Sequence, residues 1–130
     1  MSYIPKYIIK RMFPNDAFKA VEGGIEMTAV NVISPISVDE MPDDVLNYVE
    51  LLIDGQALSK DIMAKTKITV ENKTYTIENA KEFVGQTIPV GGTIKVFCPL
   101  TTIKAGEEHE MKLTIKLDNP LQIEIKRTVQ

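Results

Sequence analysis

Alternation of apolar and polar residues is the feature that most limits what this chain can fold into. In the run HEMKLTIKL, the apolar residues Met111, Leu113, Ile115 and Leu117 occupy every second position, and polar residues lie between them. A period of two places the apolar side chains on one face of a strand and the polar ones on the other. The run therefore predicts a strand with one buried and one exposed face.

The same signal recurs along the chain between turn-forming residues. We expect strands at 7–12, 24–33, 45–53, 66–70, 74–77, 93–97, 109–117 and 121–125. Asp54-Gly55, Asn72-Lys73 and the DNP segment at 118–120 are expected turns. Only ENAKEF, at 78–83, favours a helical turn. The pattern predicts an all-β fold: one antiparallel β-sandwich domain over residues 1–130, with about eight short strands and at most one short helix.

The segment VLNYVELLIDG is apolar on both parities, which is typical of a strand covered on both faces. A loop with Leu58, Ile62 and Met63 follows it, and a loop broken by two prolines, at 34–44, precedes it. Together they offer more apolar surface than a sandwich of this size needs inside, and large exposed apolar patches mark interfaces. The residues expected at a partner interface are Ile36, Met41, Pro42, Leu52 and His109.

Composition excludes several classes of protein. The 15 basic and 18 acidic residues are scattered, with a net charge of −3 and no basic run, so we expect no nucleic-acid partner. No apolar stretch reaches the roughly 20 residues that span a membrane, and the first residues lack the pattern of a signal peptide. Cys98 is the single cysteine, which agrees with a reducing compartment. We therefore expect a cytoplasmic protein without membrane contact, in which Cys98 is a small buried residue.

The segment GEEHEM holds the single histidine, His109, between acidic residues. Zinc sites need three or four converging ligands, and only Glu107 shares the parity of His109 nearby, since Glu108 and Glu110 point to the other face. The serines lie in expected loops or termini, which disfavours a nucleophilic triad. We therefore expect His109 to be a residue at the rim or core edge of the sandwich.

Other motifs also favour structural roles. Gly23-Gly24 and Gly91-Gly92 lack the strand-to-helix context of a phosphate loop and are typical of turns or bulges. DEMPDD lacks the spacing and the glycine of an EF-hand calcium loop, so a solvated acidic loop is the better interpretation. No rule selects a glycosidase-like pair among the 18 acids. The sequence marks out no catalytic, cofactor-binding or metal-binding residue in this chain.

The order of segments resembles that of the small beta subunit of the C-glycoside deglycosidases. The resemblance lies in GGIEMTAVNV, in YVELLIDGQALSKD with its DG turn, in KITVENKTYTIENAKEF with its YT pair, and in GTIKVFCPLTTIKAGEEHEMKLTI. These segments contain 65 of the 130 residues and lie within residues 23–115, and each is a soft pattern. In place of the aromatic and arginine-rich early loop that is common in the family, this chain has SPISVDEMPDD, and it has no Trp. That departure leaves the substrate class open.

The resemblance implies a non-catalytic β-sandwich subunit that pairs with a larger TIM-barrel subunit. In such a complex the partner carries the divalent metal and the base that cleave the carbon–carbon bond between a 3-oxo sugar and its aglycone, and the small subunit stabilises the partner and shapes its active-site mouth. No catalytic residue carries over to this chain.

Two alternatives stay open, together with the option of a homo-oligomer. One is a stand-alone ligand-binding module, for example for carbohydrate, although an aromatic content of 6% without Trp speaks mildly against sugar stacking. The other is a hydrolase that uses two acids, which no acid in the pattern singles out.

Overall fold

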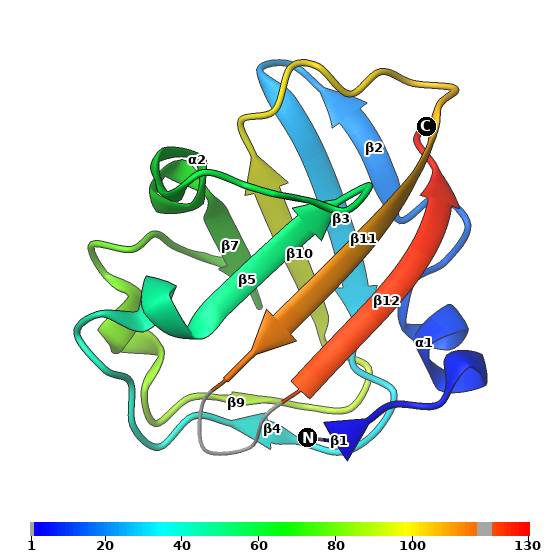
Figure 1. Cartoon of the computed structure of the whole chain (residues 1–130). Coiled ribbons are helices and arrows are strands. Elements are labelled where there is room, and N and C mark those ends of the chain that lie inside the picture. Colours follow the sequence, from blue (N-terminus) through cyan, green and yellow to red (C-terminus); the bar gives the residue numbers. More distant parts are fainter. Residues whose placement is uncertain (1, 117–120) are drawn as a thin grey trace.

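Two five-stranded sheets pack face to face (Figure 1). The structure, a computed structural model, describes residues 2–116 and 121–130. The first sheet contains, in spatial order, β1 (Ser2–Tyr3), β12 (Leu121–Thr128), β11 (Glu108–Ile115), β5 (Val49–Ile53) and β6 (Gln56–Ala57). The second contains β2 (Phe18–Val21), β3 (Gly24–Val30), β10 (Thr93–Cys98), β7 (Lys67–Val70) and β8 (Lys73–Tyr75). A small ribbon pairs β4 (Ile36–Ser37) with β9 (Thr87–Ile88).

The predicted fold class is confirmed: the chain is an all-β sandwich. Every strand pair among the described residues is antiparallel except β1 with β12. Of the twelve described strand segments, eight are longer than two residues. Seven of these overlap predicted strands, and the eighth, β2, was not predicted. Leu117 and the expected turn at 118–120 lie outside the described residues.

Two short α-helices and two 3₁₀ turns connect the strands, which is more helix than predicted. They are α1 (Lys6–Met12), α2 (Lys60–Lys65), η1 (Val45–Tyr48) and η2 (Ala80–Phe83). The expected turn in ENAKEF is η2. The loop expected after β6 is instead α2, whose first turn is capped because the Ser59 hydroxyl accepts a hydrogen bond from the Ile62 amide at 3.3 Å.

The strand predicted at 7–12 is wrong, because this segment forms α1. Ile9 and Met12 are buried three positions apart, and Phe13 follows, so the apolar spacing is that of a helix face. The helix packs against β12 and β3, where it covers one open side of the sandwich, while α2 lies at the opposite side (Figure 1). The first part of the apolar segment at 45–53 is also not a strand, since it forms η1.

Backbone conformation fixes the register at two hairpins. Asp54 and Gly55 both have positive φ, at 52° and 82°, as the predicted turn between β5 and β6 requires. The turn between β7 and β8 lies one residue earlier than predicted, since Glu71 and Asn72, rather than Asn72 and Lys73, have positive φ.

The core lies between the two sheets, and the alternation along β5 decides which side chains enter it. Leu51 is only 6% exposed and belongs to the main core cluster, which Ile53 also contacts. Leu52 is half-buried, is not a member of that cluster, and pairs with Lys112 of β11 and Ala57 of β6. Leu52 therefore lies on the outer face of the first sheet.

Candidate functional site

A hollow with a volume of about 750 Å³ lies beside the acidic loop that follows β4. We call it the loop hollow, and its lining residues are Glu40, Met41, Pro42, Tyr48, Lys81, Val84 and Lys116. Two of the predicted interface residues, Met41 and Pro42, thus lie together in it. Its apolar walls and its two lysines suit a protein surface that carries both apolar and acidic groups.

Contacts between distant segments hold this loop in place. Lys81 of η2 forms an ion pair with Asp43, and the Gly85 amide donates a hydrogen bond to the Val38 carbonyl at 3.0 Å. Pairing of β4 with β9 anchors the start of the same segment. The acidic loop is therefore attached along its length to the segment 81–88.

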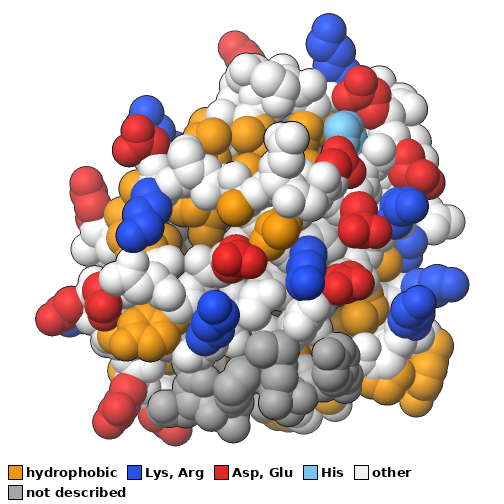
Figure 2. Space-filling model, in the orientation of Figure 1, with side chains coloured by type: hydrophobic (Ala, Val, Ile, Leu, Met, Phe, Trp, Pro, Cys, Tyr) orange, Lys and Arg blue, Asp and Glu red, His pale blue; other side chains and the backbone are white. Residues whose placement is uncertain are grey.

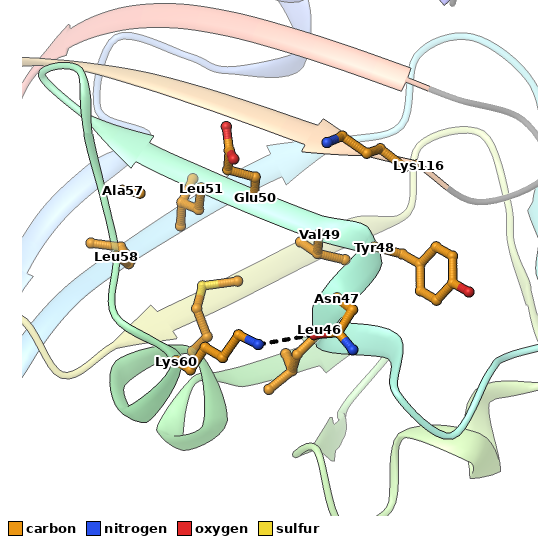
Figure 3. A pocket seen from close by; sticks show the side chains of 11 residues that line it. Leu46, Asn47, Tyr48, Val49, Glu50, Leu51, Ala57, Leu58, Lys60 and Lys116 are labelled. Carbon is orange, nitrogen blue, oxygen red and sulfur yellow. Dashed lines mark hydrogen bonds between the residues drawn. The ribbon is translucent and has the colours of Figure 1, made fainter.

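A second, smaller pocket adjoins the loop hollow. It has a volume of about 300 Å³ and lies between β5, η1 and α2 (Figure 3). We call it the α2 pocket, and its lining residues are Leu46, Asn47, Tyr48, Val49, Glu50, Leu51, Ala57, Leu58, Lys60, Met63 and Lys116. Tyr48 and Lys116 line both depressions, and the Lys116 amide donates a hydrogen bond to the Tyr48 carbonyl at 2.7 Å. The two depressions are therefore neighbours on one side of the molecule.

His109 lies between two carboxylates at the other end of β11. Its Nδ1 is 2.5 Å from Oδ2 of Asp54, and its Nε2 is 3.1 Å from Oε1 of Glu107. The Glu110 amide donates a hydrogen bond at 2.9 Å to the second oxygen of Asp54, which orients that carboxylate. We call these three side chains the His109 cluster. The cluster connects the β5–β6 turn to the start of β11.

Each contact in the His109 cluster favours the charged forms of its members. The hydrogen bond that the His109 ring donates to Asp54 raises the pKa of His109, although partial burial opposes this shift. The Glu110 amide lowers the pKa of Asp54, and His109 lowers it further. The hydrogen bond with His109 lowers the pKa of Glu107. A protonated imidazole has two N–H donors, one for each carboxylate, so protonation of His109 completes an ion pair with both Asp54 and Glu107.

This geometry agrees with the expectation of a histidine at the sandwich edge, since the His109 side chain is 16% exposed. Glu108 and Glu110 are exposed. Sequence reasoning found Glu107 and missed Asp54, which is 55 positions away and reaches the ring only through the pairing of β5 with β11. Within residues 2–116 and 121–130, no group of three or more His, Cys, Asp or Glu side chains has the arrangement of a metal site.

The five predicted interface residues lie in three regions of the fold. Met41 and Pro42 line the loop hollow. Ile36, on β4 of the same segment, is 40% exposed, and Leu52 faces outward from the first sheet beside Lys112. His109 is bound within its own cluster at the far end of β11 from Lys116. Figure 2 shows hydrophobic side chains reaching the surface among charged ones near β5 and α2.

Other sequence motifs have structural roles. Cys98 is fully buried, as predicted, and burial raises the pKa of its thiol. Gly24 lies against β10, where a Cβ atom would come within 2.1 Å of the Cys98 carbonyl oxygen, so only glycine fits. The alternating pattern did not reveal Tyr48, Lys81 or Lys116 as lining residues, because their proximity depends on loops that fold back over the sheets. The acidic loop was the signal that pointed to this region.

Comparisons with known proteins identify no family. No protein-family model matches this chain, and no curated protein matches it. In the described part of the chain, no helix is of the length and hydropathy needed to cross a membrane.

Proposed function

We propose that this chain is a non-catalytic β-sandwich subunit that binds a larger catalytic subunit through the loop hollow and the adjoining outer face of β5. The partner is a TIM-barrel protein of the C-glycoside deglycosidase type, a lyase that acts on 3-oxo sugar C-glycosides. The partner supplies the divalent metal and the catalytic base, and the small subunit stabilises it and shapes the mouth of its active site. A cytoplasmic location belongs to this proposal.

The loop hollow is the observation that carries the proposal. At about 750 Å³ it is large, and Met41, Pro42 and Tyr48 give it apolar walls. The apolar centre of a protein–protein interface is commonly surrounded by charged residues, and Glu40, Lys81 and Lys116 lie in this position here. Exposed Ile36 extends the apolar surface along the same segment.

The identity of the partner has its support in the sequence resemblance. The segments that carry the resemblance correspond to β3, to β5 and β6 with the start of α2, to β7 and β8 with η2, and to β10 and β11. They thus supply strands to both sheets of the sandwich, and the resemblance does not include β1, α1, β2, β4, β9 or β12.

Native purification tests the proposal. The chain is isolated at its natural level from its own cells, and the masses of the intact complex and its components are measured. We expect a stoichiometric complex with a barrel-sized chain, and lyase activity on a 3-oxo C-glycoside in that complex. Isolation of a lone chain or of a homo-oligomer would refute the subunit proposal.

Substitutions then locate the interface. Met41→Asp should abolish co-purification, because it places a carboxylate in the apolar wall of the loop hollow. Tyr7→Asp is the matched control, since Tyr7 is 68% exposed on α1, at the opposite side of the sandwich. Co-purification that survives Met41→Asp and is lost with Tyr7→Asp would place the interface on the α1 side.

A stand-alone ligand-binding module is the second candidate function. The observation in its favour is the α2 pocket, whose volume of about 300 Å³ falls at the lower end of the range for small-molecule sites. A sugar-binding site usually has an aromatic face on which the ring stacks, and Tyr48 is the aromatic residue that lines this pocket.

A further inference from the structure

The α2 pocket has an apolar floor that is continuous with the protein core. Leu51 is 6% exposed and is part of the main core cluster, and Leu58 and Met63 pack against that cluster. In Figure 3 the Leu51 side chain of β5 and the Leu58 side chain of the segment before α2 lie beside the same space, which Met63 of α2 also lines. Removal of an apolar group from water onto this floor is favourable, so the pocket suits a small apolar body.

Polar groups gather at one side of this floor. The Lys60 ammonium donates a hydrogen bond to the Asn47 side-chain carbonyl at 3.0 Å, which holds the ammonium beside the pocket (Figure 3). An ammonium has three donors, so two remain for another acceptor. Glu50 and Lys116 also line the pocket, but in Figure 3 they lie on the other side of the β5 ribbon from Lys60. The Lys60 ammonium is therefore the charged group beside this floor, and it attracts a negative charge.

We propose that the α2 pocket binds a small amphipathic carboxylate. The apolar body contacts Leu51, Leu58 and Met63, and the carboxylate accepts a hydrogen bond from the Lys60 ammonium. The volume of about 300 Å³ limits the body to about the size of a phenyl ring with a short alkyl chain. This proposal does not depend on the partner subunit.

An NMR titration tests the proposal with 3-phenylpropionate as the probe. Backbone amide shifts of the full chain are followed at neutral pH, with 3-phenylpropanamide as the neutral isostere and acetate as an anion without the apolar body. We expect saturable shifts at Val49, Leu58 and Met63, with a dissociation constant of roughly millimolar order for a probe of this size. The amide and acetate should each bind more weakly.

Two exposed lysines of α2 provide a matched pair of variants. Lys60 lines the pocket, and Lys65, five positions later, does not. Lys60→Gln should weaken binding of 3-phenylpropionate by about two- to five-fold, as expected for loss of an exposed charge contact. It should leave binding of the amide unchanged, and Lys65→Gln should alter neither. Both sites are exposed, so both variants should fold.

Several results would overturn the proposal. They are the absence of saturable shifts, equal affinity for the acid and the amide, shifts centred away from the pocket, and equal effects of the two lysine variants. Perturbation of the same amides by a co-purifying protein, without any response to 3-phenylpropionate, would identify the pocket as part of a protein interface and would also refute the small-ligand proposal.

Discussion

Asp54 and His109 form the shortest contact of the His109 cluster, with Nδ1 of the ring 2.5 Å from Oδ2 of the carboxylate. Asp54 has positive φ in the turn after β5, so the turn conformation itself aims the carboxylate at β11. The pKa of His109 is raised above its ordinary value of 6.5 and that of Asp54 is lowered below 3.8. The ion pair therefore contributes to stability in a defined range of pH.

Replacement of Asp54 by Asn should lower the free energy of unfolding by about 0.5–1 kcal/mol near pH 6. Asn tolerates positive φ and keeps an oxygen for the Glu110 amide, so the change removes mainly the charge. Because the pKa of His109 is raised, its contribution is complete below pH 6.5 and is lost as the pH rises through the raised pKa. The difference between wild type and variant should therefore shrink in alkaline solution, as measured by urea unfolding from pH 5.5 to 9.

An NMR titration of the His109 ring provides an independent check, since the variant should bring its pKa closer to 6.5. Asp16→Asn is the control, because Asp16 is exposed and forms no hydrogen bond with the cluster. A loss of stability that is constant across this pH range would mean that the charge on His109 contributes nothing.

Substitution of two neighbouring leucines on β5 by aspartate should have very different effects on the stability of the domain. Leu51→Asp places a carboxylate in the main core and should cost more than about 3 kcal/mol, a large part of the roughly 5–15 kcal/mol by which a domain is ordinarily stable. Leu52→Asp faces outward opposite Lys112 and should change the stability by less than about 1 kcal/mol. Circular dichroism and urea unfolding measure both effects. Unfolding of the Leu52 variant would place that side chain in the core.

Arg127 connects the end of α1 to the sandwich through hydrogen bonds. Its Nε and Nη2 donate hydrogen bonds to the Phe13 carbonyl at 3.0 and 2.7 Å, just after the helix ends. Arg127→Ala should cost about 1–3 kcal/mol, because charge-assisted hydrogen bonds to the C-terminal end of a helix are lost. Arg127→Lys should retain only part of the stability that Arg127→Ala loses, because an ammonium lacks the planar fork of a guanidinium.

Hydrogen exchange distinguishes this role from a general loss of stability. In the Arg127→Ala variant, the amides of α1 should lose more of their protection from hydrogen exchange than the amides of β10. Lys126→Ala, at the adjacent exposed position, should leave both unchanged. Equal loss of protection throughout the molecule would show that Arg127 does not act through α1.

The sequence predicted the sheets better than the surface, for a physical reason. Alternation is local, so the strand around Met111 could be recognised from its own residues, and burial of Met111 agrees with it. The segment 7–12 was misassigned because a short apolar run fits either a strand or a helix, and its packing against β12 and β3 decided between them.

The candidate site depends on contacts that local patterns do not contain. Met41 lies beside Tyr48 and Lys116 in the loop hollow because the acidic loop is attached to the segment 81–88. Asp54 reaches His109 through the register of two paired strands. Composition marked the acidic loop as unusual, but long-range packing determines its neighbours.

Asn31 should be among the residues most sensitive to substitution, although no motif marked it. It is 2% exposed. Its amide nitrogen donates to the carbonyls of Ser34, Ile88 and Pro89 at 2.8, 3.1 and 3.3 Å. Its side-chain oxygen accepts from the Ile33 amide at 3.3 Å. One side chain thus joins the end of β3 to the segments that lead to β4 and β10.

Asn31→Ala should cost about 1–3 kcal/mol, because buried carbonyls lose their donor. Asn31→Asp should cost more at neutral pH, since an ionised carboxylate would face the Ser34, Ile88 and Pro89 carbonyl oxygens. Acid should reduce the additional cost, because a protonated carboxyl can donate one hydrogen bond. Urea unfolding at pH 7 and pH 4.5 measures the difference in stability between the variants. The control is Asn15→Asp, because Asn15 is exposed. If Asn31→Asp were as stable as Asn31→Ala at both pH values, the three carbonyls would not repel an ionised carboxylate, and if Asn31→Ala were as stable as wild type, the carbonyl contacts would contribute nothing to the fold.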